Sequence, residues 1–333
     1  MVPMTDRTRG VMNGAVAYVI WGLCPVYWKL LATVPAIQLI AHRIGWSVPL
    51  LVLMLSLRGE LHVVAAAVQN RRTMATYALS ASLLGVSYFV CVWAVNAGFI
   101  VDVSLGMYIN PLVSVLLGVF FCKETLNTVQ WLAMVLAAAG MLAMAIDYGK
   151  FPWIAFTIAL DFGLYGLVQK KAPLGALPGV TIEFVLLSVP LVVYLLVVDQ
   201  QGDGAFGHTG AAQDWLMAGL GATTVVPQVM FAASAQSIPL SILGILQFLG
   251  PTISVLLGVL VYDEAFGTVK ALSFGLVWLG LILFTTQSVR SPKVEQPISL
   301  ELVVVSSVRL SAAEYIAAVD DKSVESHSAL NVV

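Results

Sequence analysis

The chain has 333 residues, of which 59% are hydrophobic and 10% are charged, and its net charge is −2. Soluble domains average roughly 45–50% apolar and about 25% charged residues, so a soluble fold could not bury this much apolar surface. Together with a mean hydropathy of +0.94, the composition predicts an all-α integral membrane protein. No basic segment is present, which excludes nucleic acid as a partner. Cys24, Cys91 and Cys122 lack metal-ligand spacing, so the sequence predicts no metal and no cofactor.

Ten stretches are long and apolar enough to cross a membrane, which takes about 20 residues per helix. They are residues 11–31, 36–57, 73–95, 103–121, 128–146, 151–169, 179–198, 215–235, 239–261 and 268–287. Residues 1–10 precede them as a short amino-terminal segment. Residues 289–333 form a polar tail that is too short and broken to build a core, and we expect it to be disordered.

Basic residues gather in every second connection between these spans. The residues that would share one side of the membrane are Arg7, Arg9, Arg58, Arg71, Arg72, Lys123, Lys170 and Lys171. The connections on the other side are mainly acidic and hold Lys150, with Lys270 entering the last span there. Because basic loops stay in the cytoplasm, this pattern predicts a bacterial inner-membrane protein with both termini cytoplasmic.

An internal repeat divides the chain into two halves. Residues 111–140 match residues 251–280 at 13 of 30 positions with a constant offset of 140 and no gap. Two five-helix units, residues 11–147 and 151–288, account for this repeat. An odd number of helices forces the second unit to enter the membrane in the opposite sense, and inverted repeats of this kind are typical of secondary transporters.

Several blocks of sequence also match a known family. They are WGLCPVYWKLLATVPAIQLIAHRIGWS (21–47), VWAVN (92–96), SLGMYINPLVSVLLG (104–118), FGLYGLV (162–168) and QFLGPT (247–252). Over residues 10–288 the chain resembles the RarD branch of the EamA-type drug/metabolite transporters. The resemblance implies ten transmembrane helices as two EamA repeats in the inner membrane, and a link to chloramphenicol sensitivity. The chain departs from the usual pattern of that branch at Gln38, Gln169, Gln236 and Phe248.

Polar and aromatic residues recur at helical spacing, and such faces should point away from lipid. The candidate substrate-binding residues are Tyr18, Trp21, Lys29, His42, Arg43, Tyr108, Asn110 and Gln247. Trp28, Trp46, Tyr88 and Trp93 are candidates for additional aromatic walls. Arg43 lies about two turns inside its span. It is either a counter-ion for an anionic substrate group or for Asp102, or a side chain that extends to the headgroups.

Two carboxylic acids, Asp161 and Glu183, lie well within apolar spans and are candidate proton-coupling residues. Asp161 has an alternative role as a structural hydrogen bonder. Burial near the bilayer middle disfavours its charged form, and Tyr165, one turn along the same face, is placed to stabilise the protonated form.

Three pairs of structural residues repeat between the halves. Pro111 and Pro251 are expected to act as hinges or to kink their helices for packing, and Gly118 and Gly258 to allow close helix contact. Glu124 and Glu264 are expected either to cap the next helix or to latch the repeats together.

These features predict a secondary transporter that exports small metabolites or drug-like amphiphiles by alternating access, with protons as the coupling ion. Its partners are a small-molecule substrate and membrane lipids. No phosphate-binding loop, metalloprotease motif or nucleophile motif is present, so neither an enzyme nor an ATP-driven pump is predicted. A non-transporting membrane protein, such as a lipid scramblase or an assembly partner, is the alternative.

Overall fold

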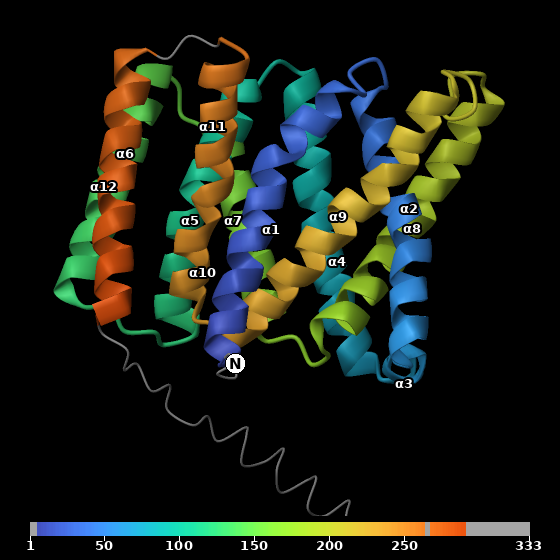
Figure 1. Cartoon of the computed structure of the whole chain (residues 1–333), viewed down its shortest axis with the longest axis horizontal. Helices are drawn as coiled ribbons and strands as arrows, with labels where there is room; N and C mark the ends of the chain where they lie inside the picture. Colours follow the sequence, from blue (N-terminus) through green and yellow to red (C-terminus); the bar gives the residue numbers. More distant parts are fainter. Residues whose placement is uncertain (1–4, 264–266, 291–333) are drawn as a thin grey trace, which may run out of the picture. The chain divides into compact units, whose positions relative to one another are not determined.

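The computed structural model describes residues 5–263 and 267–290, and this part of the chain is all-helical with no strand. The first half contains α1 (Asp6–Lys29), α2 (Ala36–Arg58), α3 (Leu61–Gln69), α4 (Arg71–Asn96), α5 (Ile100–Phe121) and α6 (Thr128–Tyr148). The second contains α7 (Trp153–Lys170), α8 (Ala176–Gln200), α9 (Ala211–Ser237), α10 (Leu240–Gln247), α11 (Leu249–Val261) and α12 (Thr268–Arg290). Figure 1 shows their arrangement. Residues 291–333 of the predicted tail, and Glu264, lie outside the described residues.

The prediction of ten membrane spans is confirmed. Nine described segments are long and apolar enough to cross a membrane, counting α10 and α11 together as one. The tenth span is α7, which carries the polar residues Asp161, Gln169 and Lys170 and buries ten of its 18 residues. A helix surrounded by other helices needs less apolar surface than one facing lipid, which explains why α7 is less apolar than the others.

The ten crossings bring the start of α1 and the end of α12 to the same side of the bundle, the lower side in Figure 1. We call this side the amino face and the opposite one the far face. The short helix α3 lies at the amino face between α2 and α4, and Asn70 caps the start of α4 by accepting from Arg72 N and Thr73 N. Helix α3 was not predicted, because nine residues are too few to span a membrane.

The two repeats pack as an inverted pair. Helix α1 packs against α9 and α11, and its repeat counterpart α7 packs against α4 and α5. Small details follow the same symmetry. Lys123 and Asp263, which are 140 positions apart, both have left-handed backbone angles, with φ of 56° and 52°. The repeat read from the sequence is therefore also present in the backbone.

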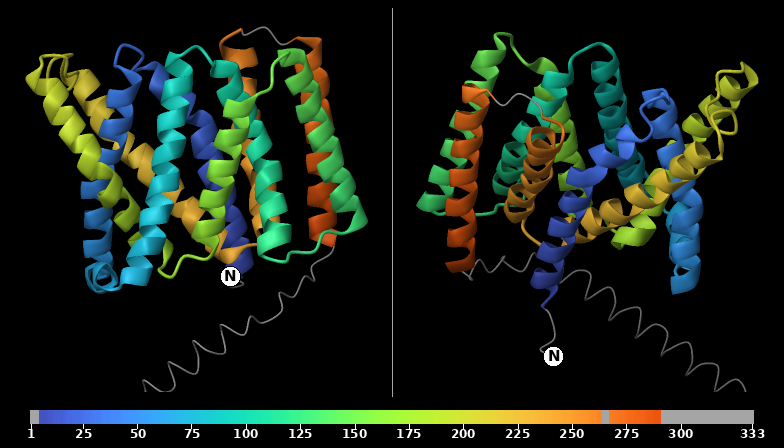
Figure 2. Two further views of the ribbon diagram at one scale, coloured as in Figure 1. Left: turned by 180° about the vertical axis from the view of Figure 1, so that it is seen from behind. Right: turned by 45° about the horizontal axis from the view of Figure 1, so that its top comes forward.

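Helices α6 and α12 lie side by side at one end of the bundle (Figure 2). Their contact is symmetric and depends on two glycines. A Cβ atom on Gly140 would lie 2.7 Å from the Ser273 carbonyl oxygen, and one on Gly280 would lie 2.7 Å from the Ala133 carbonyl oxygen. Each glycine thus lets the opposite backbone approach closely.

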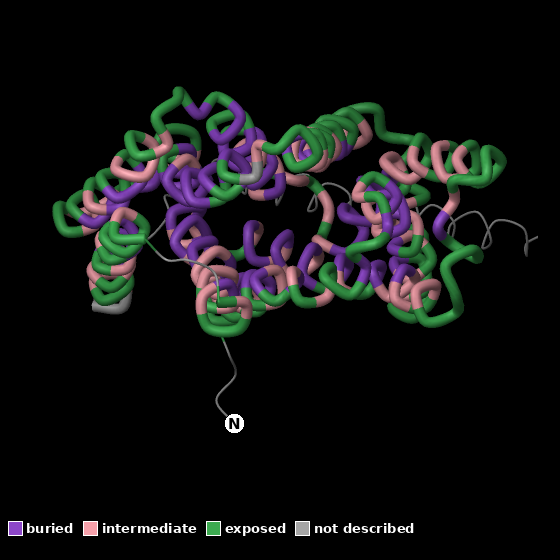
Figure 3. The backbone as a smooth tube through the Cα atoms, turned by 90° about the horizontal axis from the view of Figure 1, so that it is seen from above, coloured by how far each residue is buried: buried purple, intermediate pink, exposed green. Residues whose placement is uncertain are grey.

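Buried residues lie toward the inside of the bundle and exposed residues on its outside, as seen from above in Figure 3. Many of the exposed side chains are large and apolar, for example Leu53, Phe89 and Ile146. A soluble protein rarely exposes so many large apolar side chains, whereas a lipid-facing surface requires them.

Candidate functional site

A cavity of about 420 Å³ lies between the two repeats. Its walls come from α1, α2, α4 and α5 of the first repeat and from α7, α9, α10 and α11 of the second. The cavity extends to the far face, because its lining includes Trp28 and Val95 near the ends of α1 and α4, and both are exposed. Apolar and aromatic side chains dominate the walls, as in most small-molecule sites.

Arg43 is the one charged residue of this lining. Its Nε donates to Thr224 Oγ1 at 2.7 Å, and its guanidinium lies 4.8 Å from the Tyr88 ring centre and 5.9 Å from that of Trp28. These contacts hold the side chain inside the bundle, so it does not extend to the headgroups. Within the described residues no carboxylate lies within 4.0 Å of it. Its charge is therefore uncompensated in an apolar cavity.

Asp102 is not the partner of Arg43. Its carboxylate accepts a hydrogen bond from the Tyr148 hydroxyl at the far end of α6. The interpretation of Arg43 as a counter-ion for Asp102 is therefore wrong, because α5 directs Asp102 toward α6 and away from the cavity.

Several other polar side chains face the same cavity. Gln247 Nε2 donates to Ser114 Oγ at 3.0 Å, which joins α10 to α5 next to Asn110. The Tyr18 hydroxyl is buried and has no hydrogen-bond partner among the described residues. Gln228 of α9, Ser87 of α4 and Ser254 of α11 also line the cavity. The structure thus brings the predicted residues Tyr18, Trp21, Arg43, Asn110 and Gln247 together in one lining.

Three predicted binding residues do not line this cavity. Lys29 Nζ lies at the far face, 3.6 Å from the centre of the Tyr262 ring. The Tyr108 hydroxyl donates to the Pro251 carbonyl at 3.2 Å, so it joins α5 to α11. The His42 ring packs against Phe206 in a tilted arrangement, with ring centres 5.3 Å apart. Each lies on a helix that does line the cavity but points to another neighbour.

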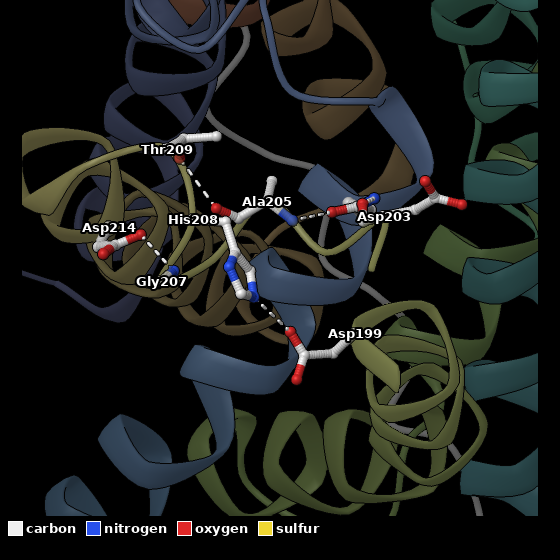
Figure 4. Close-up of polar contacts among 8 residues, drawn as sticks. Asp199, Asp203, Ala205, Gly207, His208, Thr209 and Asp214 are labelled. Atoms are coloured by element: carbon white, nitrogen blue, oxygen red, sulfur yellow. Dashed lines mark hydrogen bonds and ion pairs between the residues drawn. The ribbon is translucent and has the colours of Figure 1, made fainter. Parts of the chain in front are cut away.

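The loop between α8 and α9 explains the positions of His42 and Gln38. Gln38 Nε2 donates to the Asp203 carbonyl at 2.8 Å, and Gln38 Oε1 accepts from Ala205 N at 2.9 Å. Figure 4 shows the same loop tied by His208 Nε2 to Asp199 Oδ1 at 3.1 Å. This face of α2 therefore holds a far-face loop, while Arg43, one residue after His42, turns into the cavity.

Of the aromatic candidates, Trp21, Trp28 and Tyr88 line the cavity. Trp46 instead packs against Phe206, and Trp93 packs against Trp153. Gln228 is one of the polar lining residues that sequence reasoning missed. A signal existed, because Gln228 follows Pro227 in the middle of an apolar span, where an unpaired amide is costly.

The two candidate proton-coupling acids have different surroundings. Asp161 has one carboxylate oxygen, Oδ2, that is buried without a hydrogen-bond partner in the described part. Glu183 is fully buried and accepts from the Tyr165 hydroxyl at 3.0 Å. The expectation that Tyr165 stabilises Asp161 is therefore wrong, since α7 directs the Tyr165 hydroxyl to α8.

The amino side of the cavity is closed by close packing. A Cβ atom on Gly10 would lie 2.6 Å from Ile238 Cγ2, and one on Gly14 would lie 2.6 Å from Ser234 Oγ. Lys170 Nζ donates to the Ile238 carbonyl at 2.7 Å. Helices α1 and α7 thus both bind the turn between α9 and α10.

Glu124 binds the same turn from the first repeat. Its carboxylate accepts from Leu240 N at 2.6 Å and from Ser241 N at 2.8 Å, so it caps α10. Capping of the next helix was the wrong interpretation, because Asn127 caps α6. Gly118 makes room, since a Cβ atom there would lie 2.8 Å from Glu124 Oε2.

The repeat-related prolines differ in their surroundings. Pro111 lies inside the unbroken helix α5. In the second repeat the helix is broken at Phe248, between the end of α10 and the start of α11. Pro251 lies three residues after this break, in the first turn of α11. Gly258 is buried in α11. Only the second-repeat helix is therefore interrupted at the cavity. Among the residues that the structure describes, no cluster of His, Cys, Asp and Glu could hold a metal ion.

Comparison with known proteins identifies the family. The model of the EamA-like transporter family matches residues 8–146 and again residues 151–286. The chain belongs to this family. An uncharacterized transporter of Bacillus subtilis, YojE, is 40% identical over 86% of this chain and 96% of its own length. Protein RarD of Streptomyces exfoliatus is 35% identical over 86% and 91%, and protein RarD of Escherichia coli 34% over 84% and 95%.

These relatives assign the chain to the RarD branch of the family, among membrane transporters of small molecules in the bacterial inner membrane. A solved crystal structure with 16% identity supports the fold. It superposes with a TM-score of 0.64 and covers 84% of this chain and 98% of its own.

Proposed function

We propose that the chain is a secondary transporter that exports small metabolites or drug-like amphiphiles across the inner membrane by alternating access. The observation that carries the proposal is the cavity between inverted repeats, which extends to the far face and is packed shut toward the amino face. Inverted repeats supply two half-open states around one central site. With cytoplasmic termini, as the basic loops predict, the cavity faces the periplasm.

The unequal packing of the repeats supports alternation. Helix α9 packs extensively against α1 and α2, whereas its repeat counterpart α4 packs less against α7 and α8. An exchange of these two environments would open the amino face and close the far face. No new fold is needed for this exchange, because each repeat already adopts one of the two arrangements.

The lining indicates the chemistry of the solute. Aromatic walls suit a compact apolar body, and Arg43, without a carboxylate partner, suits one anionic or strongly polar group. Asn110, Gln228 and Gln247 offer amides for neutral polar groups. The site therefore fits one small amphiphile at a time.

Flux through proteoliposomes tests this function. Vesicles that contain the protein are loaded with a metabolite extract of the host cell and with chloramphenicol, a drug-like amphiphile, and released solutes are identified by mass spectrometry. We expect saturable release of a defined subset of solutes, and a loss of that release in Arg43→Gln. The matched control is Arg58→Gln, since Arg58 is an exposed cation at the amino-face end of the same helix.

The same vesicles test the alternative. If labelled phospholipids cross the bilayer and no solute is released faster than from protein-free vesicles, the chain is a scramblase and the transport proposal is wrong. If neither lipid nor solute moves, an assembly role replaces both.

A further inference from the structure

Four buried side chains form a hydrogen-bonded network beside the cavity. They are Glu183 of α8, Tyr165 and Gln169 of α7, and Gln228 of α9, and none is more than 1% exposed. The Tyr165 hydroxyl donates to Glu183 Oε2 at 3.0 Å. Gln169 Nε2 donates to Glu183 Oε1 at 2.8 Å and to the Tyr165 oxygen at 2.7 Å. Gln228 Nε2 donates to the same Tyr165 oxygen at 2.5 Å.

Gln228 is the member of this network that lines the cavity. A carboxylate that solvent does not reach is therefore separated from the solute site by one tyrosine and one amide. Buried networks of this kind respond as a unit, because each hydrogen bond fixes the donor or acceptor role of the next group.

The surroundings of Glu183 provide no cation. Among the described residues no Lys, Arg or His nitrogen lies within 4.0 Å of its carboxylate. Helices α2, α3, α4 and α9 pack on α8, and α7 reaches Glu183 through Tyr165 and Gln169. Tyr77 and Tyr88 of α4 and Tyr165 of α7 interact electrostatically with Glu183. The other titratable groups of these five helices that are described are His42, Arg43, Arg58, His62, Arg71, Arg72, Cys91, Asp161, Lys170 and Asp214, and none of them is ion-paired with Glu183.

We propose that Glu183 binds the coupling proton and that Tyr165 and Gln228 transmit its protonation state to the solute cavity. This inference rests on the proposed transport function. It assigns the coupling proton to Glu183 and not to Asp161, whose carboxylate interacts with Ser87 of the lining and lies outside this network.

An ionised Glu183 satisfies all of these bonds. A carboxylate only accepts, and both Tyr165 and Gln169 donate to it. The Tyr165 hydroxyl is also saturated, because its one hydrogen goes to Glu183 and its two lone pairs accept from Gln169 and Gln228. No group in the network can change its role alone.

A proton on Glu183 Oε2 reverses this order. The new O–H donates to the Tyr165 oxygen, which then meets three donors with two lone pairs, and the Tyr165 hydrogen loses its acceptor. The conflict ends when the Gln228 amide turns and its oxygen accepts from Tyr165. When the amide turns, its C=O group moves from the cavity side to Tyr165 and its NH2 group moves to the cavity side. Gln228 then presents N–H to the cavity in place of C=O. Proton binding thus changes which solute groups the cavity accepts.

Infrared spectroscopy of the reconstituted protein without solute tests the proton site. As the pH falls, the parent should gain the C=O band of a protonated carboxylic acid. Glu183→Gln should lose this band, and Asp161→Asn, the matched buried acid, should keep it. Loss of the band in Asp161→Asn with retention in Glu183→Gln would overturn the proposal. This readout needs no transport, so it separates a failed inference from a failed transport function.

A second experiment tests the relay, by which we mean the transmission of the protonation state of Glu183 through Tyr165 and Gln228 to the cavity. It measures release from the extract-loaded vesicles with and without an acidic outside medium. We expect the pH gradient to accelerate release by the parent and by Tyr77→Phe, in which a buried tyrosine outside the relay loses its hydroxyl. In Tyr165→Phe, solute exchange should persist while the acceleration is lost, and the Glu183 band should shift. If the Gln169 amide turned instead of the Gln228 amide, the Tyr165 hydroxyl would be dispensable for coupling proton binding to solute release. Gradient-accelerated release by Tyr165→Phe would therefore refute the relay.

Discussion

Arg43 shows how a single residue defines the solute site. A charged side chain at the bilayer centre costs about 2.5–3.5 kcal/mol on insertion scales. Contacts with the Tyr88 and Trp28 rings and the bond to Thr224 offset part of that cost. No carboxylate within the described residues neutralises the charge, so an anionic solute group would gain the full interaction.

Arg43→Gln should discriminate solutes by charge. A hydrogen bond to a charged group contributes about 1.5–3 kcal/mol, so we expect roughly a tenfold or larger loss of affinity for carboxylate-bearing solutes. Competition for release in the vesicle assay by phenylacetate and by its neutral analogue phenylacetamide measures this difference. Phenylacetamide should compete equally in the parent and the variant, and an equal loss for both compounds would mean that Arg43 only supports the fold.

At the scale of the helix, much of the fold follows from the sequence. Apolar length located the ten crossings, and the offset of 140 predicted which helices are equivalent. Helical spacing alone could not place Lys29, His42 and Tyr108, because the neighbour of each helix face depends on how distant segments pack. The loop at Asp203 and Ala205, which binds Gln38 and packs on His42 through Phe206, is a contact of this kind.

The pairing of α6 with α12 depends on backbone approach at Gly140 and Gly280. Gly280→Ile should therefore lower the thermal stability of the protein in detergent, since overpacking costs about 1–3 kcal/mol. Gly275→Ile is the matched control on the same helix, because nothing lies within 4 Å of a Cβ atom there. Midpoints measured by unfolding-sensitive fluorescence should fall for Gly280→Ile alone. Equal midpoints for both variants would show that α6 and α12 can separate without cost.

For the whole molecule, the orientation in the membrane decides in which direction alternating access would move the solute. Gln69 ends α3 at the amino face, and Gln201 follows α8 at the far face; both are exposed. In a background without the three native cysteines, Gln69→Cys should react with an impermeant maleimide only after the cells are opened. Gln201→Cys should react in intact cells, because basic loops stay in the cytoplasm. Reaction of Gln69→Cys in intact cells would reverse the proposed direction of export.

Alternation also requires that closure of one face be linked to opening of the other, and Glu124 provides the means to test it. Its carboxylate caps α10 of the other repeat with two backbone bonds at the closed amino face. Glu124→Ala removes both, which should disfavour the amino-closed state by roughly 1–3 kcal/mol, a 5- to 150-fold shift in population. The change needs no solute, because it alters the balance between two states of the free protein.

Spin-label distances at both faces measure the outcome. One pair, Phe121→Cys with Ser237→Cys, reports on the amino face, and another, Ala32→Cys with Asn96→Cys, reports on the far face; all four positions are exposed. In Glu124→Ala we expect the amino-face distance to lengthen and the far-face distance to shorten together. Glu60→Ala should change neither, since Glu60 is an amino-face acid whose side chain caps no helix. If the amino-face distance alone changes, the two faces move independently and inverted repeats do not produce alternating access here.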